Sequence, residues 1–146
     1  MYFCDALPFF GVLPLVLVIL LVLALFVLQT VLPGRFREPV APGGPSELAE
    51  DMGNRDHLRP LTVIGQRAAR ALNNMHEAMP VFLGLALMNL ILGPGATAIT
   101  GAWVFLAARI AFVVLYLAGV PVVRSLVWFV GLAGLVMMLI PLLERL

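Results

Sequence analysis

The feature that most constrains this chain is a set of four long apolar segments. They cover about residues 6–32, 61–92, 96–118 and 122–143 of a sequence that is 62% hydrophobic. About 20 apolar residues rising 1.5 Å each cross a hydrocarbon core of about 30 Å, so each segment is long enough for a transmembrane helix. Four such helices account for most of the 146 residues. The sequence therefore predicts an all-α integral membrane protein with a single four-helix domain over residues 1–146.

The connections between these segments predict how the helices are arranged. The second segment is followed by "GPG" and the third by "AGVP", and turns this short force neighbouring helices into an antiparallel, up-down bundle. The one long connection, 33–60, is rich in proline, glycine and mixed charges, which indicates a solvated loop. Arginines concentrate in or beside the first and third connections: Arg35, Arg37, Arg55, Arg59, Arg67, Arg70 and Arg124. By the positive-inside rule we expect these connections in the cytoplasm and both termini outside it.

Charge and cysteine content exclude several classes of function. All nine basic residues are arginine and the net charge is +1, which is not the basic surface that nucleic acids require. The single cysteine, Cys4, allows no internal disulfide and no cysteine cluster, and we expect no metal site. Charges confined to one leaflet argue against a channel or transporter. The absence of lysine beside abundant Ala, Gly, Leu and Arg suggests a GC-rich bacterial genome and thus the inner membrane.

A polar stripe opens the second apolar segment, in "RAARALNNMHEAMP". At 100° per residue, one face of roughly 80° holds Arg67, Arg70, Asn74 and Glu77. Asn73 lies at the margin of this face and His76 points away from it. An overhanging helix whose arginines reach up to lipid phosphates would also explain a residue such as Arg67.

Glu77 requires a different explanation because it lies about 22 Å of helix before the end of its segment, well inside the apolar zone. An unpaired carboxylate there would cost several kcal/mol or become protonated. Arg109 of the antiparallel third segment lies at a similar depth. We therefore expect a buried Glu77–Arg109 pair whatever the function of the protein.

Further polar residues are predicted at the same end of the bundle. Tyr116 follows Arg109 by two helical turns, and Arg124 with Ser125 opens the fourth segment. Taken singly, Tyr116 and Arg124 could be interfacial anchors. Together with the stripe they predict a pocket for a small ligand that carries several carboxylates and an ammonium group, with an arginine or serine able to stabilise a bound thiolate. Glutathione has all of these groups, and lipid could supply an apolar second substrate.

These residues resemble the MAPEG family, the membrane-associated proteins in eicosanoid and glutathione metabolism, which includes microsomal glutathione transferases. The similarity covers about residues 67–129. Its first part is the pattern Arg67-x-x-Arg70-x-x-x-Asn74-x-x-Glu77-x-x-Pro80-x-Phe82, and its second part is "ARIAFVVLYLAGVPVVRS".

The resemblance implies a homotrimer with glutathione sites between neighbouring subunits. It implies that glutathione is bound by Arg67, Arg70, Asn74, Glu77 and Tyr116, with Arg109 at the base of the site and Arg124 with Ser125 as the catalytic pair. Phe112 stands where the prostaglandin synthase member has a histidine, so the resemblance does not extend to isomerase activity. The family also contacts glutathione from its first helix, but the first segment here departs from that pattern: it has no clear internal basic residue, and Arg35 and Arg37 lie only at its end.

Two functions follow from these observations. The first is a glutathione-dependent transferase or peroxidase acting on lipophilic electrophiles through an arginine-stabilised thiolate. The second is a non-catalytic lipid-binding or scaffold protein, since the family includes a lipoxygenase-activating member that presents lipid without conjugating it. Tyr116 and Arg124 favour the enzyme, because packing alone has little use for them at the cytoplasmic mouth.

Overall fold

The computed structural model describes residues 7–44, 46–54 and 58–146. The described part of the chain forms five helices and no strand: α1 (Leu7–Arg35), α2 (Glu47–Met52), α3 (Val63–Leu92), α4 (Ala96–Ala118) and α5 (Pro121–Leu143). Cys4 and Arg55 lie outside the described residues. All helices except α2 are long and apolar enough to cross a membrane.

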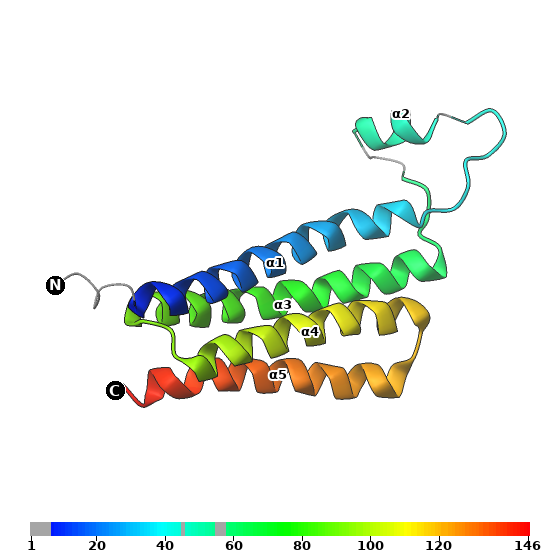
Figure 1. Ribbon diagram of the computed structural model, residues 1–146. Helices are drawn as coiled ribbons and strands as arrows, with labels where there is room; N and C mark the ends of the chain where they lie inside the picture. Colours follow the sequence, from blue (N-terminus) through cyan, green and yellow to red (C-terminus); the bar gives the residue numbers. More distant parts are fainter. Residues whose placement is uncertain (1–6, 45, 55–57) are drawn as a thin grey trace.

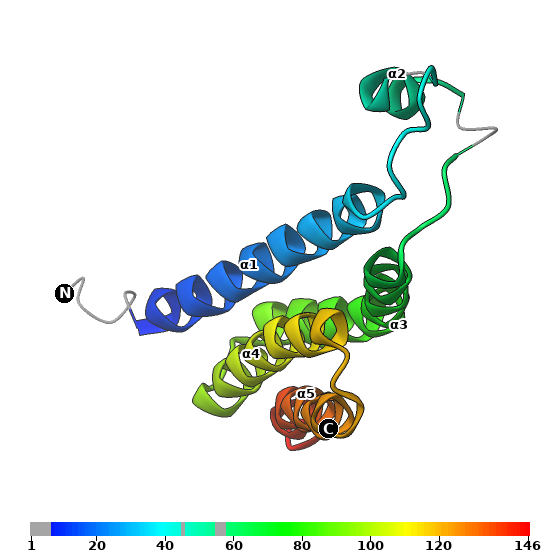
Figure 2. The same cartoon turned by 90° about the vertical axis from the view of Figure 1, so that its right-hand side faces the viewer.

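The long helices run alternately in opposite directions, so the chain is an up-down bundle (Figure 1). The start of α1 and the end of α5 lie at one end, and α2 and the α4–α5 turn lie at the other. Helix α4 contacts α1, α3 and α5, and its contact with α5 is the most extensive. The view along the bundle shows α1 on the side away from α5 (Figure 2). The all-helical, four-span membrane architecture predicted from the sequence is confirmed.

Local sequence explains where the helices begin and end. Thr62 caps α3, since its hydroxyl oxygen accepts a hydrogen bond from the backbone N–H of Gly65. Helix α4 ends at Gly119, which has φ +77° and donates its N–H to the carbonyls of Leu115 and Tyr116. Helix α5 begins at Pro121, whose missing N–H costs nothing at the first helical position.

The long connection differs from the solvated irregular loop expected over residues 33–60. Its first residues continue α1 as far as Arg35, and the six residues Glu47–Met52 form α2. Helix α2 is set off from the bundle near the C-terminal end of α1, on the side of α1 that faces away from α3 (Figure 1). Six residues are fewer than two turns, too few for a hydrophobic period to be read from sequence. The structure thus adds a helical element at the loop end of the bundle.

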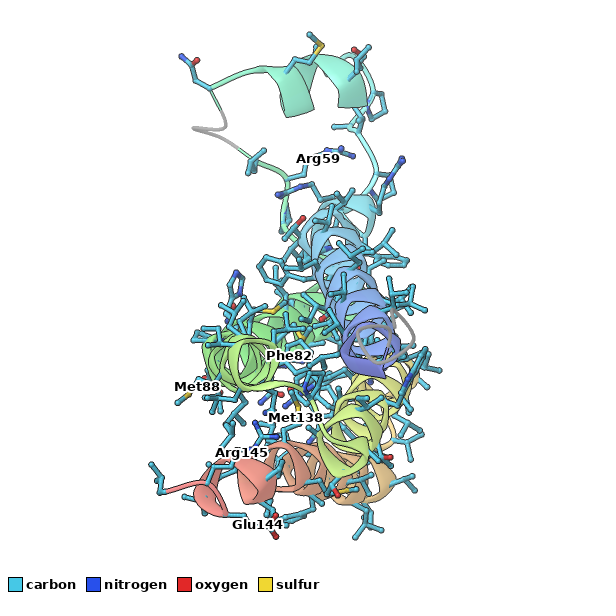
Figure 3. All side chains as sticks on the ribbon, turned by 60° about the vertical axis from the view of Figure 1, so that its left-hand side comes forward. Arg59, Phe82, Met88, Met138, Glu144 and Arg145 are labelled. Carbon is cyan, nitrogen blue, oxygen red and sulfur yellow. The ribbon has the colours of Figure 1, made fainter. Side chains whose placement is uncertain are left out.

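The core is a continuous apolar cluster that links all the long helices. Phe82 of α3 and Phe105 of α4 stack with their ring centroids 4.6 Å apart, and both are fully buried. The buried amide of Asn89 is satisfied, because its Nδ2 donates to the carbonyls of Leu85 and Met138. Figure 3 shows Phe82 and Met138 directed into the interior. The hydrogen bond from Asn89 to the Met138 carbonyl joins α3 to α5, and it satisfies a polar group for which lipid offers no partner.

Helices α4 and α5 touch backbone to backbone at two glycines. A Cβ added to Gly134 would lie 2.7 Å from the Gly101 carbonyl oxygen, and one added to Gly101 would lie 2.6 Å from the Gly134 carbonyl oxygen. Small residues at such a crossing let membrane helices approach closely. One turn earlier on α5, a Cβ at Gly131 would be 3.5 Å from the Ala108 methyl, which is an ordinary contact.

We therefore expect Gly134→Ala to separate α4 and α5 and to destabilise the protein by about 1–3 kcal/mol, the usual cost of overpacking. Gly131→Ala is the matched control on the same helix and should unfold at or above the wild-type temperature, because alanine favours helix. Thermal unfolding of the detergent-purified variants measures both. Equal unfolding temperatures for the two variants would show that the glycine contact does not limit helix packing.

Candidate functional site

The loop end of the bundle contains a polar cavity of about 490 Å³ between α3, α4 and α5. Most of the residues predicted from the sequence line it. From α3 it has the stripe residues Arg70, Asn74 and Glu77, together with Asn73. From the other two helices it has Phe112, Tyr116, Arg124, Ser125, Trp128 and Phe129. Three helices that are separate in sequence therefore bring their polar positions to one cavity.

Two rings fix the position of the arginine that opens α5. The guanidinium carbon of Arg124 lies 4.4 Å from the centroid of the Tyr116 ring. The Tyr116 ring in turn packs edge-on against Phe112, with centroids 5.4 Å apart. A cation over an aromatic face is held by the ring quadrupole. Arg124 is thus half-buried and oriented on the wall of the cavity.

Ser125 is also on this wall, but its hydroxyl hydrogen is used within its own helix. Ser125 Oγ donates to the Pro121 carbonyl at 3.1 Å. This is a common arrangement for a serine in a helix. In this geometry only the oxygen lone pairs of Ser125 remain for a ligand, whereas a thiolate needs a donor. Of Arg124 and Ser125, only Arg124 therefore has N–H donors available to bind an anion.

Arg109 lies beneath the cavity and its partner differs from the one expected. Its Nη1 donates to Asn74 Oδ1 at 2.6 Å, whereas a direct pair with Glu77 was expected. Glu77 is near enough to act on the guanidinium electrostatically, and both residues border a second, smaller cavity of about 190 Å³. Residue numbers predict the similar depth of Glu77 and Arg109, but not that Asn74, one turn before Glu77, faces Arg109 more directly.

This hydrogen bond orients the Asn74 amide. A guanidinium has donors only, so the atom that faces Arg109 must be the amide oxygen. The Asn74 NH₂ group is then free to face the cavities that the residue lines. Arg109 itself is 5% exposed, and its Nε is buried with no hydrogen-bond partner among the described residues. Phe105 and Phe112 cover the guanidinium, at 5.0 and 5.8 Å from their ring centroids.

Arg67 does not line the polar cavity. Its Nη1 donates to the Leu117 carbonyl at 3.2 Å, at the C-terminal end of α4. A Cβ at Gly119 would lie 2.6 Å from Arg67 Nη1, so the guanidinium fits against the αL residue of the α4–α5 turn. A cation there also complements the helix dipole. The helical period placed Arg67 on the stripe, but its long side chain reaches the neighbouring turn.

Sequence reasoning gave little weight to several residues of the site. The helical period places Asn73 only at the margin of the stripe, and the family resemblance concerns Phe112 only as a replacement for histidine. The sequence pattern does not single out Trp128 or Phe129, although Trp128 follows Arg124 and Ser125 by one turn and so shares their face. His76 packs edge-on against Phe26 of α1, with centroids 5.1 Å apart, on another side of α3. In the described chain, no group of three or more His, Cys, Asp or Glu residues could hold a metal ion.

Comparison with known proteins identifies the family of this chain. No curated protein matches the chain. A scan against protein-family models matches the MAPEG family over residues 13–143, which include α3, α4 and α5 in full and most of α1. With that match over most of its length, the chain belongs to the MAPEG family.

Proposed function

We propose that the protein is a glutathione-dependent transferase or peroxidase that acts on lipophilic electrophiles. The observation that carries this proposal is the polar cavity, where Arg70 and Arg124 can meet carboxylates or a thiolate and Glu77 can meet an ammonium group. Glutathione carries two carboxylates, one ammonium and one thiol. A cavity of about 490 Å³ is within the range of small-ligand sites.

The chemistry needs few groups. When the thiol loses its proton to water at the cavity mouth, the Arg124 guanidinium stabilises the resulting thiolate. The sulfur then bonds to an electrophilic carbon while the leaving group departs with its electron pair. With a hydroperoxide, sulfur takes one oxygen and releases the alcohol, and a second glutathione yields disulfide and water. The half-buried Trp128 and the exposed Phe129 provide an apolar wall for the lipophilic substrate.

The proposal includes a homotrimer with sites between subunits. Arg70, Asn73 and Glu77 are exposed on a single chain, although Glu77 lies about 21 Å along α3 from Val63. Polar side chains at such depth are not left facing lipid, so a second copy would cover them. We place the α2 loop in the cytoplasm of a bacterial cell and both termini outside the inner membrane, following the arginine distribution.

Replacing Arg124 tests the proposed catalytic role. Glutathione titrated into the purified protein should give a saturable thiolate absorbance at about 240 nm, and Arg124→Ala should abolish it. Arg124→Lys keeps a charge without the planar fork and should give a weaker signal. Size-exclusion chromatography checks that each variant keeps the wild-type oligomer. A full signal in Arg124→Ala would contradict the role assigned to this residue.

Replacing Asn74 distinguishes a role in glutathione binding from a role in helix packing. In a lipid-binding or scaffold protein, Asn74 would serve packing alone. Asn74→Asp keeps an acceptor for Arg109 but removes the NH₂ donor. The fold should therefore persist, while the affinity for glutathione should fall about 10- to 100-fold, which corresponds to the loss of one hydrogen bond to a charged group. Asn74→Leu leaves the buried guanidinium without its acceptor and should destabilise the fold by about 3 kcal/mol.

The matched control is Asn73→Asp, which adds the same charge to the same cavity at a position that Arg109 does not orient. Calorimetric titration with glutathione compares the variants, and thermal unfolding compares their stability. An equal loss of affinity in both aspartate variants would assign the effect to charge. Unchanged affinity in Asn74→Asp would contradict the role assigned to the Asn74 NH₂ group in binding glutathione.

A further inference from the structure

A second large cavity lies at the loop end of the bundle and shares no lining residue with the polar cavity. Its volume is about 860 Å³, and its walls come from the end of α1, from α2, from the end of the loop and from α3. The residues that determine its chemistry are Val31, Arg35, Arg37, Leu48, Leu58 and Leu72. It therefore combines two guanidinium groups with an aliphatic lining.

The rim of this cavity is held by hydrogen bonds between the two ends of the loop. The N–H of Glu38 donates to the Pro60 carbonyl at 3.0 Å, and the N–H of Thr62 donates to the Phe36 carbonyl at 2.9 Å. Arg37 Nη1 donates to the Arg59 carbonyl at 2.5 Å. Figure 3 shows Arg59 between α2 and the end of the bundle. The loop is thus closed at its base, and Arg37 is fixed where it lines the cavity.

The arginines of this cavity still have donors to offer. Arg37 is half-buried, and its Nε is buried with no hydrogen-bond partner among the described residues. Arg35 is exposed in the last turn of α1. A guanidinium binds phosphate through paired N–H donors, and an unpaired buried donor is costly unless a ligand or water satisfies it. The charged part of the cavity is therefore suited to an anion with several oxygens.

The apolar part of the cavity points to an amphiphile. Val31 is 56% exposed, and it continues the outward face of α1 that includes Val27 and Leu28, which are 61% and 68% exposed. A soluble anion would gain nothing from this surface or from Leu48, Leu58 and Leu72. An acyl chain attached to the anion would cover it. Basic pockets between transmembrane helices at the cytoplasmic side are typical sites for anionic lipid headgroups.

We propose that this cavity binds an anionic phospholipid. Its phosphate lies on Arg35 and Arg37, and one acyl chain runs over Val31 along the outward face of α1. The same anion chemistry has a second possible source, because a carboxylate of glutathione could also bind these arginines. The lipid differs from the tripeptide in needing the aliphatic walls, and this difference can be tested. The proposal does not depend on catalysis in the polar cavity.

The test uses the full chain, delipidated in detergent and incubated with phosphatidylglycerol or phosphatidylcholine, with bound lipid counted by native mass spectrometry. Wild type should retain phosphatidylglycerol in preference to phosphatidylcholine. Arg35→Gln should reduce that retention at least tenfold. Leu72→Trp should do the same by filling the cavity while both arginines remain. Thermal unfolding before lipid is added confirms that each variant is folded.

Arg145→Gln is the charge-matched control. Arg145 lies at the opposite end, where it donates to the carbonyls of Leu92 and Gly93. The Arg145→Gln variant should retain as much phosphatidylglycerol as the wild type does. Equal retention of the two lipids by wild type, or full retention by both Arg35→Gln and Leu72→Trp, would overturn the proposal. A fall in glutathione affinity in Arg35→Gln, with lipid retention unchanged, would assign the arginines to the tripeptide.

Discussion

The constraint on which the rest of the structure depends is the satisfaction of polar groups at bilayer depth. The Arg109–Asn74 hydrogen bond is the clearest case, because it joins α3 and α4 through a guanidinium that is 5% exposed. In hydrocarbon neither group has water as an alternative partner. The bond therefore fixes the register of the two helices. It also decides which end of the Asn74 amide faces the cavities, so one contact would connect packing to the proposed recognition of glutathione.

The same constraint shapes the loop end of the bundle. Arg67 donates a hydrogen bond to the Leu117 carbonyl near the end of α4 and fits against Gly119, while Arg124, in the first turn of α5, lies over Tyr116. Each of these two arginines has a defined partner, although both lie at the loop end of the bundle. Arg67 holds the α4–α5 turn, and Arg124 lines the polar cavity. Two arginines at the same end of the bundle thus have different contacts.

The sequence predicted the helical spans and the polar face of α3, because hydropathy and a 3.6-residue period are local properties. It did not predict which partner Arg109 takes. Depth along antiparallel helices is computed from residue number, but the direction of each side chain depends on how the helices are rotated against one another. Arg67 shows a second limit, since a period assigns the Cα to a face while a long side chain can reach another element. Helix α2 was too short to leave a readable period.

In the topology and the binding sites proposed for this protein, the arginines near the loop end would act in both, and the two effects would share one physical cause. A guanidinium is costly in hydrocarbon and favourable beside phosphate or carboxylate, so arginines that keep a loop on the cytoplasmic side also remain available to anions there. Arg35 and Arg37 line one cavity, and Arg70 and Arg124 line the other. What distinguishes the cavities is their other residues. Aliphatic walls favour an acyl chain, whereas Asn74, Glu77 and Tyr116 provide the varied hydrogen-bonding groups that a peptide-like ligand requires.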